Sequence, residues 1–375
     1  MLNHEKFYTC PWGISLNMQK GTSRFIQIWL GVMCCLVMAA CGNDESVIPP
    51  SDERVTGDTY QDLSSPLVKD VDKTYHTTLW SCLYFGQYPA NEVVAGSFDA
   101  VDDYALQEGD VIVDAELYQR LQQATWEDDE TLIDGVRYRR MNGHDAVSCS
   151  NNREQHYRWL NVEEYHYFAY TPIKWRVLKI TGTQAVLLAD RMPDTCPFAA
   201  EATDVSWSES LLRQWLNSVF YQRAFSLAEQ TAILQSSVKN APNYYFGTSC
   251  GPDTQDFVFI LSESEVFSSY LAEDYGFYMG DGIDDPARRF KSTLYAKCRG
   301  AWWSPVDDYR GNSFWFMRTN GYTMSNVTYV CDFGYLYNRG TVVTCDDAAV
   351  LPAITIDLSK ANWQIAPSVS STDIQ

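Results

Sequence analysis

The chain has 375 residues and is strongly acidic, with 48 Asp and Glu residues against 28 Lys and Arg and a formal net charge of −20 at pH 7. Hydrophobic residues make up 46% of the sequence and aromatic residues 14%, which is enough for a sizeable core and excludes a wholly disordered protein. The charge would repel phosphate backbones, and no basic patch or arginine-rich helix offsets it, so the composition argues against nucleic acid as a partner.

The N-terminal sequence is typical of an export signal. Lys20 and Arg24 precede an apolar run over residues 25–38 that is short for a membrane span. The run ends in Met38-Ala39-Ala40-Cys41, which resembles a bacterial lipobox, so Cys41 would be the lipidated residue. A plain secretion signal or a single anchoring helix is the alternative.

This interpretation divides the N-terminal part of the chain. Met18 becomes the expected start, residues 1–17 an over-called segment upstream of it, and residues 18–41 a lipoprotein signal peptide. Residues 42–75 are polar and contain a Pro-Pro pair, which predicts a flexible tether. The protein would then be exported, anchored to the bacterial cell envelope by its N-terminal lipid, and in contact with the membrane only there.

A folded domain is predicted over residues 76–360. Residues 79–88 are strand-like, and Pro89 is expected to end the strand. Residues 95–170 are rich in Asp and Glu and poor in apolar runs, which indicates an acidic insertion on the surface of the domain. One short helix is predicted within it, over residues 115–123.

Residues 173–189 predict a β-hairpin. Ile173, Trp175 and Val177 alternate with neighbouring residues in the pattern of a strand. Thr181-Gly182-Thr183 forms the turn, and residues 185–189 form the second strand.

Three helix starts carry a capping box, in which a serine and a glutamate three residues later satisfy the first free amides. The pairs are Ser206 with Glu209, Ser226 with Glu229, and Ser262 with Glu265. The helix after the first pair would bury one apolar face, made of Leu211, Leu212, Trp215, Leu216, Val219 and Phe220. Between the last two starts, residues 257–261 predict an apolar strand.

The C-terminal half is strand-rich. Short β segments follow Trp302, separated by glycines and closing with residues 354–358, and residues 361–375 read as a disordered tail. Helices first and strands later predict an α+β fold in a single domain.

These landmarks together resemble an uncharacterised family of domains of unknown function found in bacterial secreted and surface proteins. The motifs that carry the resemblance are YFGQYP at 84–89, PIKWRVL at 172–178, AVLLAD at 185–190, WSESLLRQWLN at 207–217, AFS at 224–226, FVFILSESE at 257–265, STLYAK at 292–297, WFMRTNG at 315–321 and AVLPAITI at 349–356. Leu351 stands where the family has an arginine, and the acidic insertion is longer than in the family. The resemblance implies a fold distantly like C-type lectins and formylglycine-generating enzymes, and no established activity.

The stretch AWWSPVDDYRGNSFWFMRTNG at 301–321 is the predicted recognition surface. Tryptophan rings stack on sugars, and aspartate and arginine side chains bind their hydroxyls. The predicted ligand-binding residues are Trp302, Trp303, Asp307, Asp308, Arg310, Trp315 and Arg318. The alternative is that Trp302, Trp315 and Phe316 are core and Arg318 a buried structural arginine, which leaves Asp307, Asp308 and Arg310 as the exposed part.

Metal sites have weaker signals. Asp281, Asp284 and Asp285 form an oxygen-rich loop that would suit calcium, although the spacing is not that of an EF-hand and a solvated turn explains it as well. His156 and His166 with Glu163 or Glu164 could share a metal, but together with His144 they read more simply as surface histidines. No cofactor is firmly implied, and calcium is the metal that the sequence would admit.

Catalytic motifs are equally sparse. Residues 247–251 match the GxSxG pattern of a nucleophile elbow, but the last histidine of the chain is His166, so a turn explains them better. No cysteines have CxxC spacing; Cys331 and Cys345 flank a turn and could form a disulfide, and Cys298 lies in the same half.

The sequence therefore predicts a non-catalytic, lipid-anchored surface protein that binds an extracellular glycan or protein. The alternative is an exported enzyme, either a glycan hydrolase using two of the many carboxylates or an oxidase of the formylglycine-generating kind.

Overall fold

The structure is a computed structural model, and it describes residues 53–55, 58–69, 77–96, 105–147, 161–267, 275–277 and 284–373. The predicted signal peptide at 18–41, with its lipidated Cys41, and the upstream segment at 1–17 lie outside these residues. Within the described part, no helix is both long enough and apolar enough to cross a membrane.

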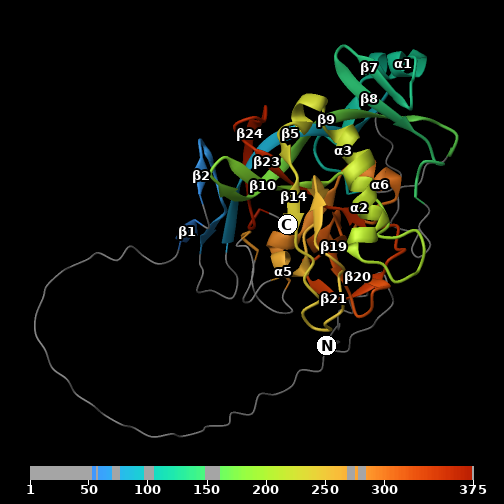
Figure 1. Ribbon diagram of the computed structural model, residues 1–375. Coiled ribbons are helices and arrows are strands. Elements are labelled where there is room, and N and C mark those ends of the chain that lie inside the picture. The colour runs from blue at the N-terminus through green and yellow to red at the C-terminus, as the bar shows by residue number, and fades with distance from the viewer. Residues whose placement is uncertain are drawn as a thin grey trace, which may run out of the picture. The chain divides into compact units, whose positions relative to one another are not determined.

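The largest element is a twelve-stranded sheet (Figure 1). Its long middle strands, β5 (Thr77–Val94) and β9 (His166–Thr181), pair antiparallel along most of their length. After the turn at Gly182, whose φ is +60°, β10 (Gln184–Ala189) pairs with β9. The predicted hairpin is confirmed.

The predicted strand at 79–88 is also confirmed, but it does not end at Pro89. β5 continues to Val94 because the register shifts between Pro89, which lies opposite Tyr170, and Asn91, which lies opposite Ala169. Pro89 therefore stands at an irregularity of the ladder, where its missing N–H costs no regular strand hydrogen bond.

The predicted disordered tail at 361–375 is wrong over residues 364–370. β24 (Gln364–Ser370) pairs antiparallel with β5. The predicted tether at 42–75 is partly ordered as well, since β2 (Thr59–Tyr60) and β3 (Leu63–Ser64) form a small hairpin and β4 (Leu67–Lys69) pairs with the start of β5. β24 gains its order from a strand about 280 residues away in the sequence, whereas β2, β3 and β4 pair with strands close to them in the chain.

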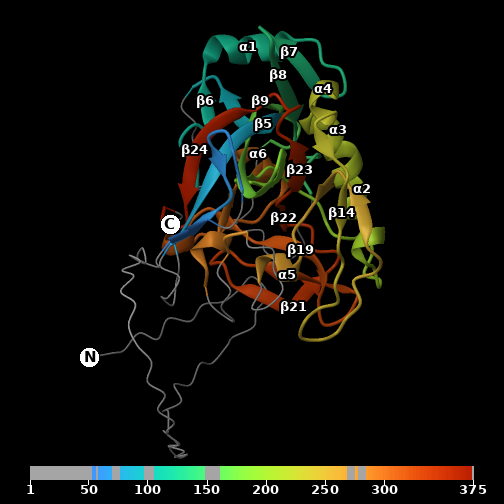
Figure 2. The same ribbon diagram turned by 60° about the vertical axis from the view of Figure 1, so that its left-hand side comes forward.

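A five-stranded sheet forms the other main layer. Its strands, in spatial order, are β12 (Asp194–Thr195), β22 (Ala349–Val350), β19 (Trp315–Asn320), β20 (Asn326–Val330) and β21 (Leu336–Val342). Every residue of β19 is buried. In both ribbon views β20 and β21 lie at the opposite end from α1 and the β7–β8 hairpin (Figures 1 and 2). The described residues are therefore a strand-rich mixture of strands and helices, as predicted for an α+β fold.

The helices are short. The longest helical run joins α2 (Leu211–Trp215), the π-helical turn η3 (Leu216–Phe220) and α3 (Tyr221–Ala224). Its N-cap is Ser210, whose hydroxyl accepts from the Arg213 N–H, and not Ser206 as predicted. Ser206 precedes a separate 3₁₀ turn, η2 (Trp207–Glu209), and its side chain makes no cap hydrogen bond there.

The other two predicted helix starts are confirmed. Glu229 accepts from the Ser226 N–H at α4 (Leu227–Gln230), and Glu265 accepts from the Ser262 N–H at α5 (Glu263–Val266), both at 2.7 Å. The predicted strand at 257–261 is shorter in the structure, where β16 is Val258–Phe259.

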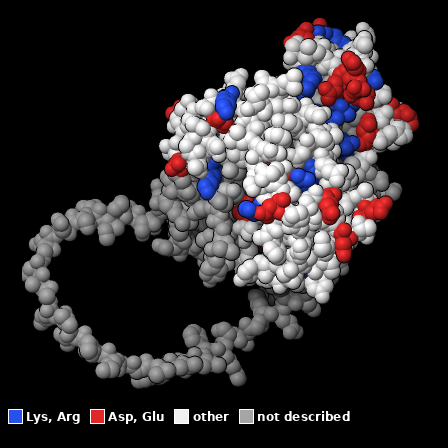
Figure 3. Space-filling model, viewed as in Figure 1, with Lys and Arg blue, Asp and Glu red and all other residues white. Residues whose placement is uncertain are grey.

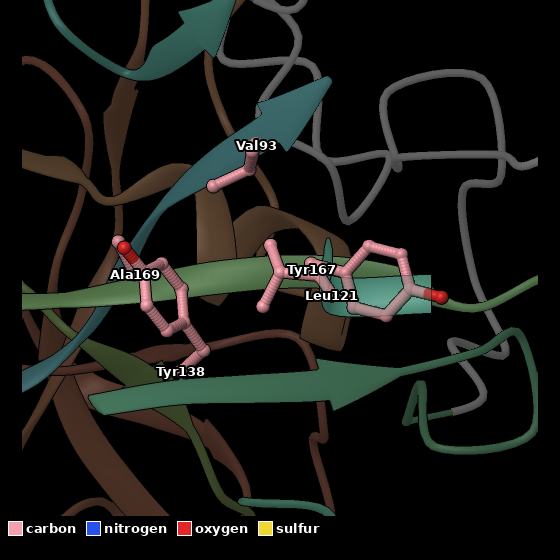
Figure 4. Close-up of a cluster of buried hydrophobic side chains, with 5 residues drawn as sticks. All are labelled: Val93, Leu121, Tyr138, Tyr167 and Ala169. Atoms are coloured by element: carbon pink, nitrogen blue, oxygen red, sulfur yellow. The ribbon is translucent and has the colours of Figure 1, made fainter. Parts of the chain in front are cut away.

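The described part of the acidic insertion has a small core of its own (Figure 4). α1 (Ala115–Gln123) has the predicted bounds and follows β6 (Val111–Val113), and the hairpin of β7 (Glu130–Ile133) and β8 (Val136–Met141) comes after it. Leu121 of α1 and Tyr138 of β8 pack against Val93, Tyr167 and Ala169 of β5 and β9. The β7–β8 hairpin is thereby held on the end of the large sheet.

The remaining elements are short strands and short helical segments. They are the strands β1 (Glu53–Val55), β11 (Arg191–Met192), β13 (Ile233–Leu234), β14 (Ser236–Val238), β15 (Thr254–Asp256), β17 (Phe290–Ser292), β18 (Asn312–Ser313) and β23 (Ala353–Asp357), and the helical segments η4 (Pro286–Arg288), α6 (Leu294–Arg299) and η5 (Asp307–Tyr309).

Candidate functional site

The seven residues predicted to bind a ligand do not share one surface. Four of them are buried: Trp302, Trp303, Trp315 and Arg318. The other three, Asp307, Asp308 and Arg310, lie in or beside η5, where the Asp307 side chain is 96% exposed and pairs with Arg310 at 3.5 Å.

Arg318 has a structural environment. Its guanidinium donates to the backbone carbonyls of Ile260 and Lys239 and pairs with the Glu265 carboxylate at 2.5 Å. Trp315 is likewise engaged inside the protein, since its Nε1 donates to the Arg288 carbonyl at 3.2 Å. Neither side chain can reach a ligand in this arrangement.

The predicted calcium loop is only partly described, since Asp281 lies outside the described residues. Asp285 accepts from the Ala287 N–H and pairs with Arg288 at 3.2 Å, which fixes its carboxylate inside the protein. Burial raises the pKa of the neighbouring Asp284. Within the described ranges no three His, Cys, Asp or Glu side chains lie together as a metal site would require.

The histidines have separate partners. His144 is within 2.8 Å of Glu163 on the surface, and His166 Nδ1 is within 2.6 Å of Glu92 Oε1. His156 lies outside the described residues. His166 and Glu163 therefore belong to two different pairs, and the structure does not bring them together as shared ligands.

The predicted Cys331–Cys345 disulfide is not formed. Cys345 is a buried free thiol that donates to Asp347 Oδ1 at 3.0 Å. Burial, and secondly the charge of Asp347, raises the pKa of this thiol well above its ordinary value. Cys82, Cys196, Cys250 and Cys298 are also buried free thiols.

We expect iodoacetamide at neutral pH to leave Cys345 unmodified in the native protein and to alkylate it after unfolding without reductant. The physical reason is that the buried thiol is neither accessible nor ionised. Peptide mapping by mass spectrometry checks this, and a 331–345 disulfide-linked peptide in the non-reduced digest would contradict it.

The best candidate for a binding surface is a loop that the sequence prediction passed over. It connects β14 to β15, and Asn243 holds it in place. The Asn243 amide donates to the carbonyls of Asn320 and Asn338, and its oxygen accepts from the N–H groups of Tyr245 and Phe246. These four hydrogen bonds fix the start of the loop, and the next three side chains are exposed.

Those side chains form an exposed cluster with one residue from the β19–β20 turn. Tyr244 is 71% exposed, Tyr245 40%, Phe246 39% and Tyr322 52%, and we call these four residues the aromatic patch. Tyr244 packs edge-on against Tyr245, and Phe246 against Tyr322, each with ring centroids 5.2 Å apart. The Arg339 guanidinium lies 4.7 Å from the centroid of the Tyr322 ring.

The surroundings of the patch are weakly charged on the visible face. Figure 3 shows the lower tip of the molecule, where β20 and β21 lie, as mostly uncharged atoms. Among the exposed large hydrophobic side chains of the described residues, the only other aromatic one is Tyr165. Clustering of four exposed rings is unusual for a surface that contacts only water.

A buried carboxylate lies behind the patch. Glu263, at the start of α5, is 3% exposed, and its Oε2 accepts from the Tyr244 N–H at 3.3 Å. Its Oε1 has no hydrogen-bond partner among the described residues. Burial raises the pKa of Glu263 to about 7, although the Tyr244 hydrogen bond acts to lower it.

The GxSxG segment 247–251 is the second half of the same loop. It is followed by β15 and not by a helix, and Ser249 Oγ accepts from the Gly251 N–H. The adjacent Cys250 is buried and accepts from the Asn320 N–H. The structure therefore agrees with a turn in place of a nucleophile elbow.

A sequence signal for the patch did exist. Tyr244, Tyr245 and Phe246 are consecutive, and they lie between Pro242 and Gly247. Three adjacent rings cannot all face one side of a strand, and the flanking residues favour a loop, so at least some rings must be exposed.

The comparison with family models assigns the segment that carries this loop. It matches the model described as Domain of unknown function (DUF6273) over residues 182–358. These residues are a DUF6273 domain. No curated protein and no solved structure matches the chain significantly.

The DUF6273 domain is narrower than the predicted domain at 76–360. It begins at the turn between β9 and β10 and ends just after β23, so β5, β9, the acidic insertion and β24 fall outside it. All four residues of the aromatic patch, together with Glu263 and Arg339, belong to the DUF6273 domain.

Proposed function

We propose that this protein is a lipid-anchored bacterial surface protein that binds an extracellular glycan through the aromatic patch and does not catalyse a reaction. The observation that carries the proposal is the clustering of Tyr244, Tyr245, Phe246 and Tyr322 on one exposed surface. The lipobox-like segment ending in Cys41 supports the anchored, exported location.

The chemistry of the patch suits a sugar. Aromatic rings offer flat apolar faces to the C–H faces of a pyranose, and the phenol groups and Arg339 offer hydrogen bonds to its hydroxyls. The backbone of the loop is fixed by Asn243, so little conformational entropy would be lost on binding. A protein ligand is the second candidate, because Tyr and Arg also dominate protein interfaces.

Binding is favoured over hydrolysis by the position of Glu263. A carboxyl group with a pKa near 7 could act as a general acid, but both its burial and its contact with the Tyr244 N–H keep it behind the patch. An oxidase is disfavoured because Cys298 and Cys345 are buried thiols, which leaves a substrate no access to them.

A glycan array probed with the purified protein tests the proposal. We expect saturable binding to a glycan class, weakened at least about tenfold when Tyr244 and Tyr322 are both replaced by alanine, since each ring is worth on the order of 1 kcal/mol or more at such a site. Titration calorimetry with the best glycan measures the change.

The matched control is Tyr165→Ala, which removes an exposed ring outside the patch. It should leave the affinity unchanged. Undiminished binding in the Tyr244→Ala/Tyr322→Ala protein would contradict the assignment to the patch. Absence of binding to every glycan would contradict the glycan ligand and direct the search to a protein partner.

A further inference from the structure

A second group of side chains carries an excess of positive charge in this acidic protein. It lies where the β7–β8 hairpin approaches α3, in a region where Figure 3 shows Lys and Arg atoms interleaved with Asp and Glu atoms. Arg137 and Arg139 come from β8 and Arg223 from α3. We call these three residues the arginine cluster.

All three guanidinium groups converge on one carboxylate. Glu130 Oε1 is 3.4 Å from Arg139 NH1 and 3.7 Å from Arg223 Nε, and Glu130 Oε2 is 4.0 Å from Arg137 Nε. The Tyr170 hydroxyl donates to Glu130 Oε1 as well, at 2.5 Å. Three positive charges thus share a single negative one.

The neighbouring carboxylate does not correct this imbalance. Asp194 pairs with Arg299 at 3.2 Å and accepts from the Tyr88 hydroxyl at 2.7 Å, so it is already neutralised. Arg223 contacts the Tyr88 hydroxyl and not a carboxylate of its own. Within the described part of the chain no further carboxylate pairs with the arginine cluster, which leaves about two positive charges uncompensated.

The arginine cluster is half-buried and not fully satisfied. The side chains of Arg137, Arg139 and Arg223 are 30%, 16% and 21% exposed. The Arg137 guanidinium stacks on the Tyr170 ring at 3.7 Å and donates through NH2 to the Arg223 carbonyl. Its Nε is buried without a hydrogen-bond partner among the described residues. Uncompensated charges that are shielded from bulk water destabilise the folded protein unless a counter-ion neutralises them.

We propose that the arginine cluster is a binding site for a doubly charged oxyanion, a phosphate monoester carried by a small molecule or by a surface glycan. Guanidinium groups bind phosphate through paired hydrogen bonds, and their planar forks are held in place here by Tyr170, Tyr295 and backbone carbonyls. The dianion matches the two uncompensated charges, whereas a carboxylate supplies only one. This site is separate from the aromatic patch and does not depend on the function proposed for it.

Titration with inorganic phosphate at about pH 8 tests this, with acetate at equal ionic strength as the comparison ion. We expect phosphate to bind saturably and to raise the unfolding temperature. Acetate should bind with an affinity at least about tenfold lower. Arg137→Ala should lower the affinity for phosphate about tenfold or more. The affinity of Arg137→Lys should be intermediate, because lysine keeps the charge but lacks the paired N–H donors of the guanidinium group.

Two further variants separate binding from folding. Arg140→Ala is the matched control, because Arg140 is on the same strand but pairs with Asp129, and it should leave phosphate affinity unchanged. Glu130→Gln removes the competing carboxylate and should strengthen phosphate binding several-fold. Equal effects of phosphate and acetate, or unaltered phosphate affinity in Arg137→Ala and Glu130→Gln, would overturn the proposal. If Arg137→Ala lowered the affinity for a phosphorylated glycan but not for a free sugar phosphate, the glycan would be identified as the carrier of the phosphate group.

Discussion

Replacing Arg318 with methionine is expected to lower the free energy of unfolding by about 3–5 kcal/mol, the range for removing one partner of a buried ion pair. Arg318 is 2% exposed, and its guanidinium satisfies Glu265 and the carbonyls of Ile260 and Lys239. Methionine fills much of the volume but leaves the carboxylate and both carbonyls without these donors. Urea unfolding followed by circular dichroism measures the change.

Arg310→Met is the matched control, because Arg310 belongs to the same aromatic stretch and also has an acidic partner. Its ion pair with Asp307 is exposed to solvent, so its loss should cost no more than about 1 kcal/mol. Similar stability losses in the two variants would contradict the structural role of Arg318. If Arg318→Met lowered the affinity for a ligand without lowering the stability, Arg318 would instead be a recognition residue.

Local sequence signals predicted the elements that depend on local interactions. The β9–β10 hairpin follows from alternation and from Gly182, and two of the three capping boxes begin helices where the serine and glutamate place them. The third failed because Ser210, four residues after Ser206, offers a competing N-cap hydroxyl, and the stronger helix starts there.

Long-range pairing was outside the reach of these signals. β24 is polar and carries Pro367, yet it is ordered because β5 has an edge for it to pair with. β4 in the predicted tether pairs with the opposite edge of β5, since Leu79 has Leu67 on one side and Ser370 on the other, and β4 is close to β5 in the sequence. Composition describes a segment by itself, whereas the order of β24 depends on a strand about 280 residues away in the sequence.

Aromatic density in the sequence did not distinguish buried rings from exposed ones, for a related reason. Trp302 and Trp315 lie in strands and loops covered on both sides, so their rings are core, while Tyr244 and Tyr322 lie in connections that hydrogen bonds hold at the surface. Both groups look alike as amino-acid types. What separates them is the position of Asn243 and the pairing of β19 between β20 and β22.

Glu263 is expected to make the stability of the protein depend on pH. Its pKa is raised to about 7 in the folded state from an ordinary value of 4.5, so the folded protein binds the proton more tightly than the unfolded chain. The sign follows: the contribution is fully present below about pH 4.5 and is lost as the pH rises through about 7. A shift of this size corresponds to roughly 3 kcal/mol.

Glu263→Gln keeps the shape and removes the ionisation, so its stability should not fall over that interval. The difference in unfolding free energy between the variant and the original protein should therefore grow from pH 4.5 to 7 and then level off, by roughly 3 kcal/mol in favour of glutamine. Glu209→Gln, which alters an exposed glutamate, is the control and should give a nearly flat difference. A flat difference for Glu263→Gln as well would mean that Glu263 ionises freely. Because burial is what raises this pKa, the Glu263 carboxylate would then be in contact with water, and the burial of Glu263 behind the aromatic patch would have to be revised.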